Sequence, residues 1–137
     1  MKNVYLIRNG VSLDQIGELV EFIDGYKDGI LKSIYYDERK SESNGLTTVK
    51  NLMAQCKVAL LFIGTNSSSS KYMEEEIQLV HSLGLRRHVY SFDEKTYPPG
   101  SSKGVPSHWK QHCGMVNRPT SSNVLRGIQG VIKWGVT

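Results

Sequence analysis

Short apolar runs and amphipathic stretches alternate along the chain. Uninterrupted apolar runs at residues 4–7 and 58–63 predict strands that are buried on both faces. Shorter runs at 34–36, 88–92 and 115–116 predict three further strands. The segments between most of these runs carry apolar residues at the spacing of helix turns, so we expect helices to connect the strands.

Polar residues mark where the predicted helices begin. Ser12 followed by Gln15 forms a capping box, in which each side chain bonds the backbone N–H of the other residue. Thr47 or Thr48 is expected to cap the second helix, and Ser122 the last one. A third helix is expected after the serine run that follows the strand at 58–63.

Strands that alternate with helices build an α/β sandwich around a parallel sheet. The pattern within residues 1–137 predicts a single domain with a flavodoxin-like three-layer architecture and a parallel five-stranded sheet of order 2-1-3-4-5. In this topology ligands bind at the carboxyl ends of strands 1 and 3. Arg8 and Asn9 follow the first of these strands, and Gly64 and Asn66 follow the other, so we predict that these four residues contact a ligand.

Three consecutive glutamates lie in the predicted third helix. Side chains on a helix contact neighbours three and four positions away. Glu74 and Glu75 each have polar neighbours at these positions and are expected to be solvated. A carboxylate on an apolar face is costly, so Glu76 is either a structural group paired with a lysine or arginine, or a functional group beside a cavity. The neighbours of Glu76 at these positions are all large and apolar or aromatic: Tyr72, Met73, Leu79 and Val80.

Composition and charge indicate which kinds of molecule this protein could bind. The 137 residues are 39% hydrophobic and 22% charged, as is ordinary for a soluble globular protein. No apolar run could span a bilayer and no signal peptide is visible, so no membrane partner and a cytoplasmic location are expected. The net charge of +4 divides into −2 for residues 1–85 (9 basic, 11 acidic) and +6 for residues 86–137 (8 basic, 2 acidic). The basic part is either a solvated surface or suits a phosphate-bearing ligand or acidic partner, and no dense basic run indicates nucleic acid.

Several motifs of other α/β proteins are absent from the sequence. It has no GxxxxGK[ST], GxGxxG or GxSxG, which argues against a P-loop, a dinucleotide-binding Rossmann fold and an α/β-hydrolase. His108, His112 and Cys113 are spaced like metal ligands, but no fourth ligand accompanies them and no metal is predicted. The only other cysteine is Cys56, and two cysteines without a CxxC fit a reducing cytosol.

A polar loop, a buried strand and a spaced glutamate follow one another in the middle of the chain. Asp37 opens the loop, which ends at Gly45. After the strand VALLFIG come Ser70, Tyr72 and Glu76, in the pattern of a serine, an aromatic residue two positions on, and a glutamate four positions later. In these features the sequence resembles the TIR domain, although the family usually has tryptophan where this chain has tyrosine.

The resemblance to TIR domains implies an enzyme that cleaves NAD at the nicotinamide–ribose bond, with Glu76 as its catalytic carboxylate. A carboxylate beside the ribose opposes the positive charge that develops as this bond breaks. NAD is then the substrate and no separate cofactor is expected. Ser70, Tyr72 and Asp37 are expected to contact the substrate, and the product is a hydrolysed, cyclic or base-exchanged ADP-ribose. The family usually follows strand 1 with a small polar residue, where this chain has Arg8.

The same resemblance implies partners beyond the substrate. Stand-alone bacterial TIR proteins of antiphage defence make a nucleotide signal that a separate effector protein reads. The family's loop after strand 2, here residues 37–45, often contacts the next subunit. A homo-oligomer that forms on activation is therefore expected.

Two other functions fit the same residues. Nucleoside 2-deoxyribosyltransferases also place a glutamate after the third strand of a similar fold, although EEEIQLV lacks the glycine of their usual E-x-G pattern. A TIR-like interaction module without catalysis fits as well. Consumption of NAD by the purified protein separates the TIR enzyme from the module.

Overall fold

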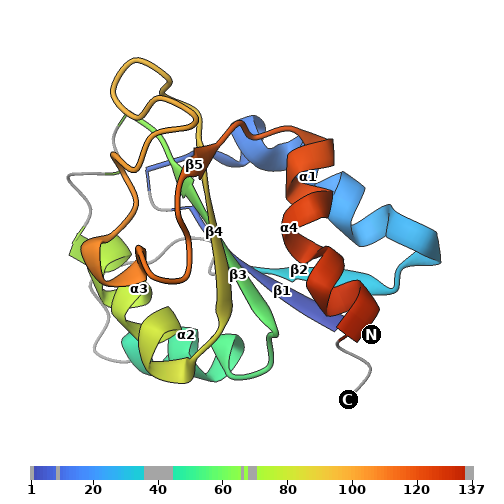
Figure 1. Ribbon diagram of the computed structural model, residues 1–137. Helices are drawn as coiled ribbons and strands as arrows, with labels where there is room; N and C mark the ends of the chain where they lie inside the picture. The colour runs from blue at the N-terminus through green and yellow to red at the C-terminus, as the bar shows by residue number, and fades with distance from the viewer. Residues whose placement is uncertain (1, 9, 36–44, 66, 68–70, 135–137) are drawn as a thin grey trace.

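One parallel sheet forms the centre of the computed structural model, which describes residues 2–8, 10–35, 45–65, 67 and 71–134 (Figure 1). The sheet order is β2-β1-β3-β4-β5 and every neighbouring pair is parallel, which confirms the predicted α/β flavodoxin-like fold. The strands are β1 (Lys2–Ile7), β2 (Leu31–Ile34), β3 (Val58–Ile63), β4 (Arg86–Ser91) and β5 (Val116–Asn117).

Helices cover both faces of the sheet, with α1 and α4 on one face and α2 and α3 on the other (Figure 1). Successive strand side chains point to opposite faces, so each strand contributes to two separate apolar cores. In β1, for example, Tyr5 and Ile7 pack on the α2–α3 side, and Leu6 on the α1–α4 side. No helix in the described part of the chain is long and apolar enough to cross a membrane. The helices are α1 (Leu13–Gly25), α2 (Gly45–Met53), α3 (Lys71–Leu83) and α4 (Ser121–Trp134), with 3₁₀ turns η1 (Tyr26–Asp28) and η3 (Ser107–Trp109).

Side-chain caps begin the first and last helices. Ser12 Oγ accepts a hydrogen bond from the Gln15 N–H at 3.3 Å, and the Ser12 N–H donates to Gln15 Oε1 at 3.1 Å, which confirms the capping box. At α4, Thr120 Oγ1 accepts from the Asn123 N–H at 3.2 Å. Thr120 is therefore the cap, and the prediction of Ser122 was wrong because three hydroxyl residues in a row offer the same local signal.

Several predicted boundaries were wrong by one to three residues, including the start of β1 at Lys2 and β5 at Val116–Asn117 rather than 115–116. β2 occupies Leu31–Ile34 rather than 34–36, because an edge strand with one exposed face alternates in polarity and forms no apolar run. β4 begins at Arg86, two residues early, because a charged residue of this strand, Arg87, is buried. The second helix begins at Gly45, ahead of both predicted caps.

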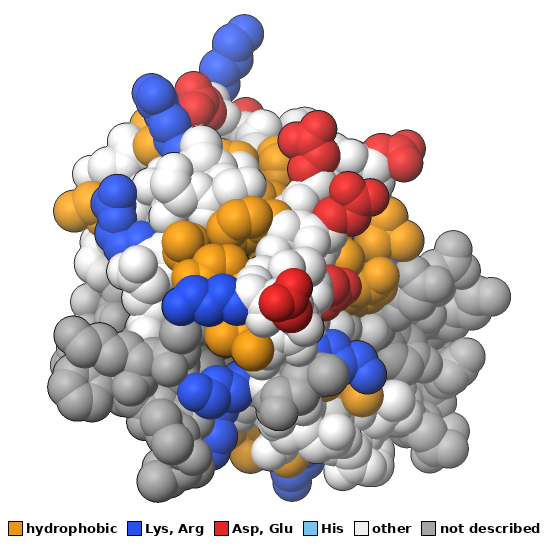
Figure 2. Space-filling view, turned by 90° about the vertical axis from the view of Figure 1, so that its right-hand side faces the viewer, with side chains coloured by type: hydrophobic (Ala, Val, Ile, Leu, Met, Phe, Trp, Pro, Cys, Tyr) orange, Lys and Arg blue, Asp and Glu red, His pale blue; other side chains and the backbone are white. Residues whose placement is uncertain are grey.

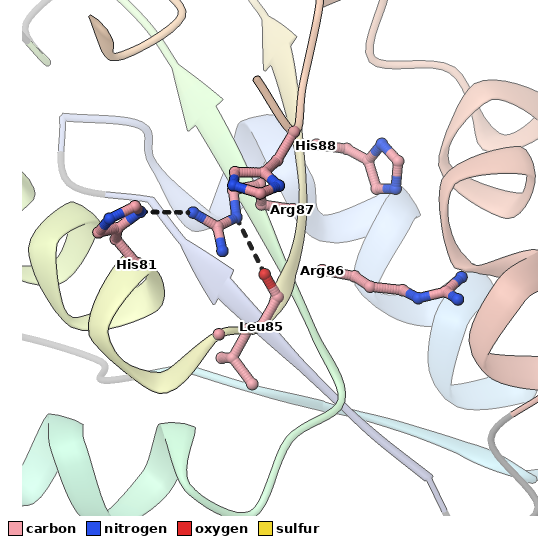
Figure 3. A pocket seen from close by; sticks show the side chains of 7 residues that line it. His81, Leu85, Arg86, Arg87 and His88 are labelled. Atoms are coloured by element: carbon pink, nitrogen blue, oxygen red, sulfur yellow. Dashed lines mark hydrogen bonds between the residues drawn. The ribbon is translucent and has the colours of Figure 1, made fainter. Parts of the chain in front are cut away.

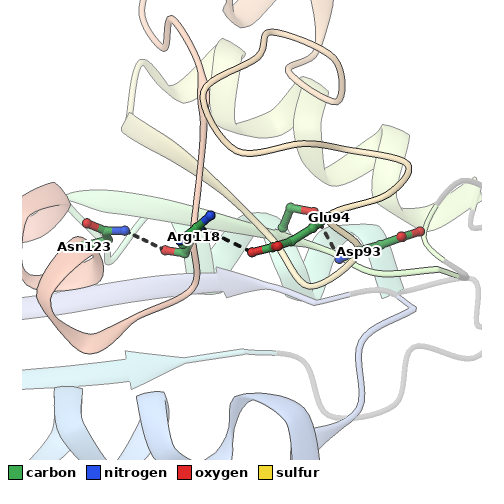
Figure 4. A network of polar contacts seen from close by, with 5 residues as sticks. Asp93, Glu94, Arg118 and Asn123 are labelled. Atoms are coloured by element: carbon green, nitrogen blue, oxygen red, sulfur yellow. Dashed lines mark hydrogen bonds and ion pairs between the residues drawn. The ribbon is translucent and has the colours of Figure 1, made fainter.

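Polar contacts join the loop after β4 to the segment before α4 (Figure 4). Arg118 Nε lies 3.4 Å from Glu94 Oε1, and Asn123 Nδ2 donates to the Arg118 carbonyl at 3.0 Å. The Asp93 N–H donates to Ser91 Oγ at 3.1 Å, at the end of β4. The Arg118 and Glu94 side chains are mostly exposed, so this ion pair adds little to stability.

Acidic side chains of the first half of the chain gather on the outer side of α1. Figure 2 looks onto the side of the molecule where α1 and α4 lie and shows Asp and Glu side chains together on this face. Asp14, Glu18, Glu21 and Asp24 of α1 are all exposed. Asp24 also accepts hydrogen bonds from the Ser33 N–H and Oγ at 2.7 and 2.9 Å, which ties α1 to β2.

Two helical glycines give a matched test of helix packing. A Cβ at Gly127 would meet the Tyr90 hydroxyl and lie 3.1 Å from His88 Cδ2, whereas a Cβ at Gly17 has nothing within 4 Å. Alanine favours a helix over glycine by about 1 kcal/mol. We expect Gly17→Ala to raise the free energy of unfolding by up to ~1 kcal/mol, and Gly127→Ala to lower it by about 1–2 kcal/mol because overpacking outweighs propensity. Urea unfolding measures both, and a stabilised Gly127→Ala protein would contradict the close approach of α4 to β4.

His88 makes stability depend on pH. Burial lowers the pKa of His88 below its usual range and Arg86 acts in the same direction, while a hydrogen bond with the Gly127 backbone opposes them. As the pH falls through about 6.5, the unfolded chain takes up a proton on His88 before the folded protein does, so the free energy of unfolding falls. We expect His88→Gln to lose less stability than the parent protein between about pH 7.5 and 5.

Urea titrations at the two pH values check this expectation for His88. At about pH 7.5 an unfolded histidine is largely neutral, so the difference between the proteins there measures only the packing of the new side chain. The further change on acidification then belongs to protonation. An equal acid loss in both proteins would show that His88 does not couple protonation to folding.

Candidate functional site

Glu76 lies on the second turn of α3 and is covered by the sheet. Only 3% of its surface is exposed, so its predicted position on the apolar face of the helix is confirmed. Tyr5 Oη donates a hydrogen bond to Glu76 Oε1 at 3.1 Å. Met73 and Val80, three residues before and four residues after Glu76, are buried in the same layer between α3 and the sheet. Glu76 is therefore buried beside apolar side chains, with the Tyr5 hydroxyl as a polar partner.

Tyr5 is a site residue that the sequence analysis missed. It is fully buried in β1, and 71 positions separate it from Glu76. A hydroxyl that donates to a carboxylate favours the charged form and fixes its orientation. The available signal was the single polar atom in the buried run VYLI, since a buried phenol normally finds a hydrogen-bond partner.

The two other glutamates of the run differ from Glu76. Glu74 is exposed, as predicted, and accepts a hydrogen bond from Gln78 Nε2 at 3.3 Å. Glu75 is half-buried, so the prediction that it is solvated holds only in part. Of the three, only Glu76 is buried.

The segments after β1 and β3 come into direct contact, as the predicted switch point requires. A Cβ on Gly64 would lie 2.9 Å from Val11 Cγ2 and 3.1 Å from the Gly10 carbonyl oxygen, so a larger residue could not occupy this position without a shift. The Gly64 N–H donates to Ser67 Oγ at 2.8 Å, and the Ser67 N–H donates to the Gly64 carbonyl at 3.1 Å. This reciprocal pair sets the path of the chain as it leaves β3 toward α3.

Two further predicted site residues, Arg8 and Tyr72, are described by the structure. Arg8 Nη1 donates to the Val11 carbonyl at 3.2 Å, and its Cζ is 5.4 Å from the centre of the Tyr35 ring, so its guanidinium lies at the end of β2. Tyr72 is half-buried, one helical turn before Glu76. The other predicted site residues lie outside the described residues: Asn9, Asp37, Asn66 and Ser70.

The two cysteines and the possible metal ligands offer no alternative catalytic group among the described residues. Cys56 and Cys113 are free and buried. Burial raises the pKa of the Cys56 thiol to about 12 and also raises that of Cys113, so neither supplies a thiolate at neutral pH. Within the described ranges, no three or more His, Cys, Asp or Glu side chains are grouped to hold a metal ion. Glu76 is thus the described group best placed for catalysis.

Comparisons with known proteins establish the fold. No family model matches the sequence, and no curated protein matches it. Among solved structures, a 2-desoxiribosyltransferase from Leishmania mexicana superposes with a TM-score of 0.62, over 98% of this chain and 99% of that chain, at 9% sequence identity. At this identity the likeness shows a shared α/β architecture along the whole chain and nothing finer.

Proposed function

We propose that this protein breaks the N-glycosidic bond of a nucleoside and transfers the sugar, with Glu76 as the carboxylate that meets the anomeric carbon. The observation that carries the proposal is a carboxylate only 3% exposed and held at 3.1 Å by the Tyr5 hydroxyl. Buried ionisable groups that are held by specific hydrogen bonds are frequent at catalytic sites. The likeness in fold to a 2-desoxiribosyltransferase supports this type of bond as the target.

The chemistry requires an oriented negative charge beside the sugar. As the C1′–N bond breaks, positive charge develops on C1′ and the ring oxygen. One oxygen of Glu76 attacks C1′, and the base leaves with the bonding electron pair and takes up a proton from solvent. A ring nitrogen of a second base then attacks C1′, releases its proton to solvent and displaces the carboxylate, which restores Glu76. The hydrogen bond from Tyr5 to Glu76 Oε1 keeps the carboxylate oriented through both steps, so the attacking oxygen is Oε2.

The burial of Glu76 favours transfer over hydrolysis. Water competes with the second base for C1′, and the burial of the residue limits that competition. Since the carboxylate is only 3% exposed, neighbouring groups have to move before a substrate reaches it. The half-buried ring of Tyr72, one turn earlier on the same helical face, is suited to form one wall of the site.

NAD is the second candidate substrate, and the spacing of Ser70, Tyr72 and Glu76 favours it. Its nicotinamide leaves from a cationic nitrogen and needs no proton, so a single carboxylate suffices for cleavage. The cyclic or base-exchanged product, the separate effector protein and the assembly of subunits belong to this candidate and stay predictions of the TIR resemblance.

Product analysis by mass spectrometry distinguishes the two substrates. In one reaction the purified protein is incubated with deoxyinosine and adenine, and in the other with NAD, each over a wide range of protein concentration. Deoxyadenosine in the first reaction supports sugar transfer between bases. Free nicotinamide in the second supports the NAD candidate, and a rise in specific activity with concentration supports assembly. No product in either reaction at any concentration would contradict a glycosidic enzyme.

A further inference from the structure

A cavity of about 470 Å³ lies at the amino-terminal edge of the sheet, where α3 ends and β4 begins (Figure 3). Its described lining includes Arg86, Arg87 and the three histidines His81, His88 and His112, and no carboxylate. Cavities of this size hold small organic ligands. The cavity therefore has room for a ligand, and the charged side chains in its described lining are all positive.

The cavity draws its cations from both faces of β4. β5 pairs with β4 only at Val89 and Tyr90, so in the described structure the first half of β4 is an edge. Strand side chains alternate, and Figure 3 shows Arg86 and His88 directed toward α4, with Arg87 on the side of α3. The cavity lies around this edge of β4, so Arg86, Arg87 and His88 all line it although they come from opposite faces of the strand.

Arg87 is the central charge of the cavity. Only 5% of its surface is exposed. Its Nε donates to the Leu85 carbonyl at 2.9 Å, its Nη1 lies 3.2 Å from His81 Nδ1, and its Cζ is 5.6 Å from the centre of the Trp109 ring. These partners are a carbonyl, an imidazole and an aromatic ring, and no described carboxylate pairs with Arg87. A nearly buried cation with no opposite charge is costly, and an anionic ligand would supply that charge.

The contact with Arg87 also determines which nitrogen of the neutral His81 ring carries the proton. Arginine has only donors, so His81 Nδ1 acts as the acceptor and the proton of the neutral ring lies on Nε2. That N–H is then available to donate to a ligand. The ring of His112 lies 6.5 Å from that of His81 and also lines the cavity, so it can contact the same ligand.

The end of α3 only partly offsets this positive charge. A helix C-terminus carries roughly half a negative charge, against the full charges of two arginines. Its last carbonyls are also occupied, because the Gly84 N–H donates to the His81 carbonyl at 3.1 Å and the Leu85 N–H to the Val80 carbonyl at 3.2 Å. The cavity remains positive, and it adjoins residues 86–137, whose net charge is +6.

We propose that this cavity binds a phosphate-bearing small molecule of nucleotide size. One guanidinium group can donate two parallel hydrogen bonds to the oxygens of a phosphate, and an imidazole N–H can add a single one. The site is separate from Glu76, which is not among the residues that line the cavity. The proposal does not depend on the reaction at Glu76.

Calorimetric titration of the purified protein with AMP, pyrophosphate and adenosine tests the proposal. We expect AMP and pyrophosphate to bind and adenosine to bind at least about tenfold more weakly, because only the first two carry phosphate. Pyrophosphate has no sugar and no glycosidic bond, so its binding separates this cavity from the candidate active site at Glu76. The proposal would be overturned if neither AMP nor pyrophosphate bound at millimolar concentration, or if adenosine bound as tightly as AMP.

Variants of exposed residues locate the binding. We expect Arg86→Gln combined with His112→Gln to weaken pyrophosphate binding by about tenfold or more, because both side chains line the cavity and both are exposed enough to change safely. Arg118→Gln is the matched control, since its side chain is 65% exposed and outside the lining. Equal loss in the double variant and the control would show that general basic charge, and not this cavity, attracts the ligand.

Discussion

Glu76→Gln is expected to lower turnover of the productive substrate by about a thousandfold or more while the protein stays folded. Glutamine keeps the shape of the side chain and removes the negative charge, so it can neither attack C1′ nor oppose positive charge there. The buried Tyr5 hydroxyl can still donate to the amide oxygen, which preserves the contact between β1 and α3. Turnover and melting temperature, measured on the same samples, separate chemistry from folding.

Glu74→Gln is the control for this experiment, because Glu74 is exposed and on the same helix. Its turnover and its stability are expected to stay close to those of the parent protein, the stability within about 0.5 kcal/mol. Tyr5→Phe refines the test: loss of the donor favours the protonated carboxyl, so the acid limb of the pH–rate profile should move to higher pH. Normal turnover in Glu76→Gln would remove Glu76 from the mechanism.

Trp109→Ala is expected to lower the free energy of unfolding by about 3–5 kcal/mol, a large part of the stability of a domain of this size. Trp109 is fully buried in the core on the α2–α3 side. Its Nε1 donates to the Ile77 carbonyl at 3.3 Å, and its ring packs beside the Arg87 guanidinium. One side chain thus attaches the segment before β5 to both α3 and β4.

Urea unfolding of Trp109→Ala is compared with Lys110→Ala, which alters the next residue of the same segment. Lys110 is exposed, so its replacement is expected to change stability by less than about 0.5 kcal/mol. Trp109→Phe should fall between the two, because it keeps most of the ring and loses the indole donor. Equal stability of Trp109→Ala and Lys110→Ala would mean that the segment does not depend on this anchor.

The sequence by itself determined the fold class, the sheet order and the position of the unusual carboxylate. Each of these depends on near neighbours: the apolar run of β3, the capping box at Ser12 and the apolar residues one turn before and after Glu76. Such patterns are local because strand and helix periodicity repeat within a few residues. The weakest local signals gave the errors, at the edge strand β2 and at the start of α4.

Only the tertiary structure decided what Glu76, Arg87 and Trp109 contact. Tyr5 reaches Glu76 across 71 positions, and Trp109 reaches the Ile77 carbonyl across 32, distances over which no periodicity in the sequence carries information. In the sequence Arg87 is one of two adjacent arginines, and only the fold places it beside Trp109 on the part of β4 that does not pair with β5. A buried polar group takes the partner that packing brings to it, so its chemistry is settled by the arrangement of strands and helices and not by its neighbours in the chain.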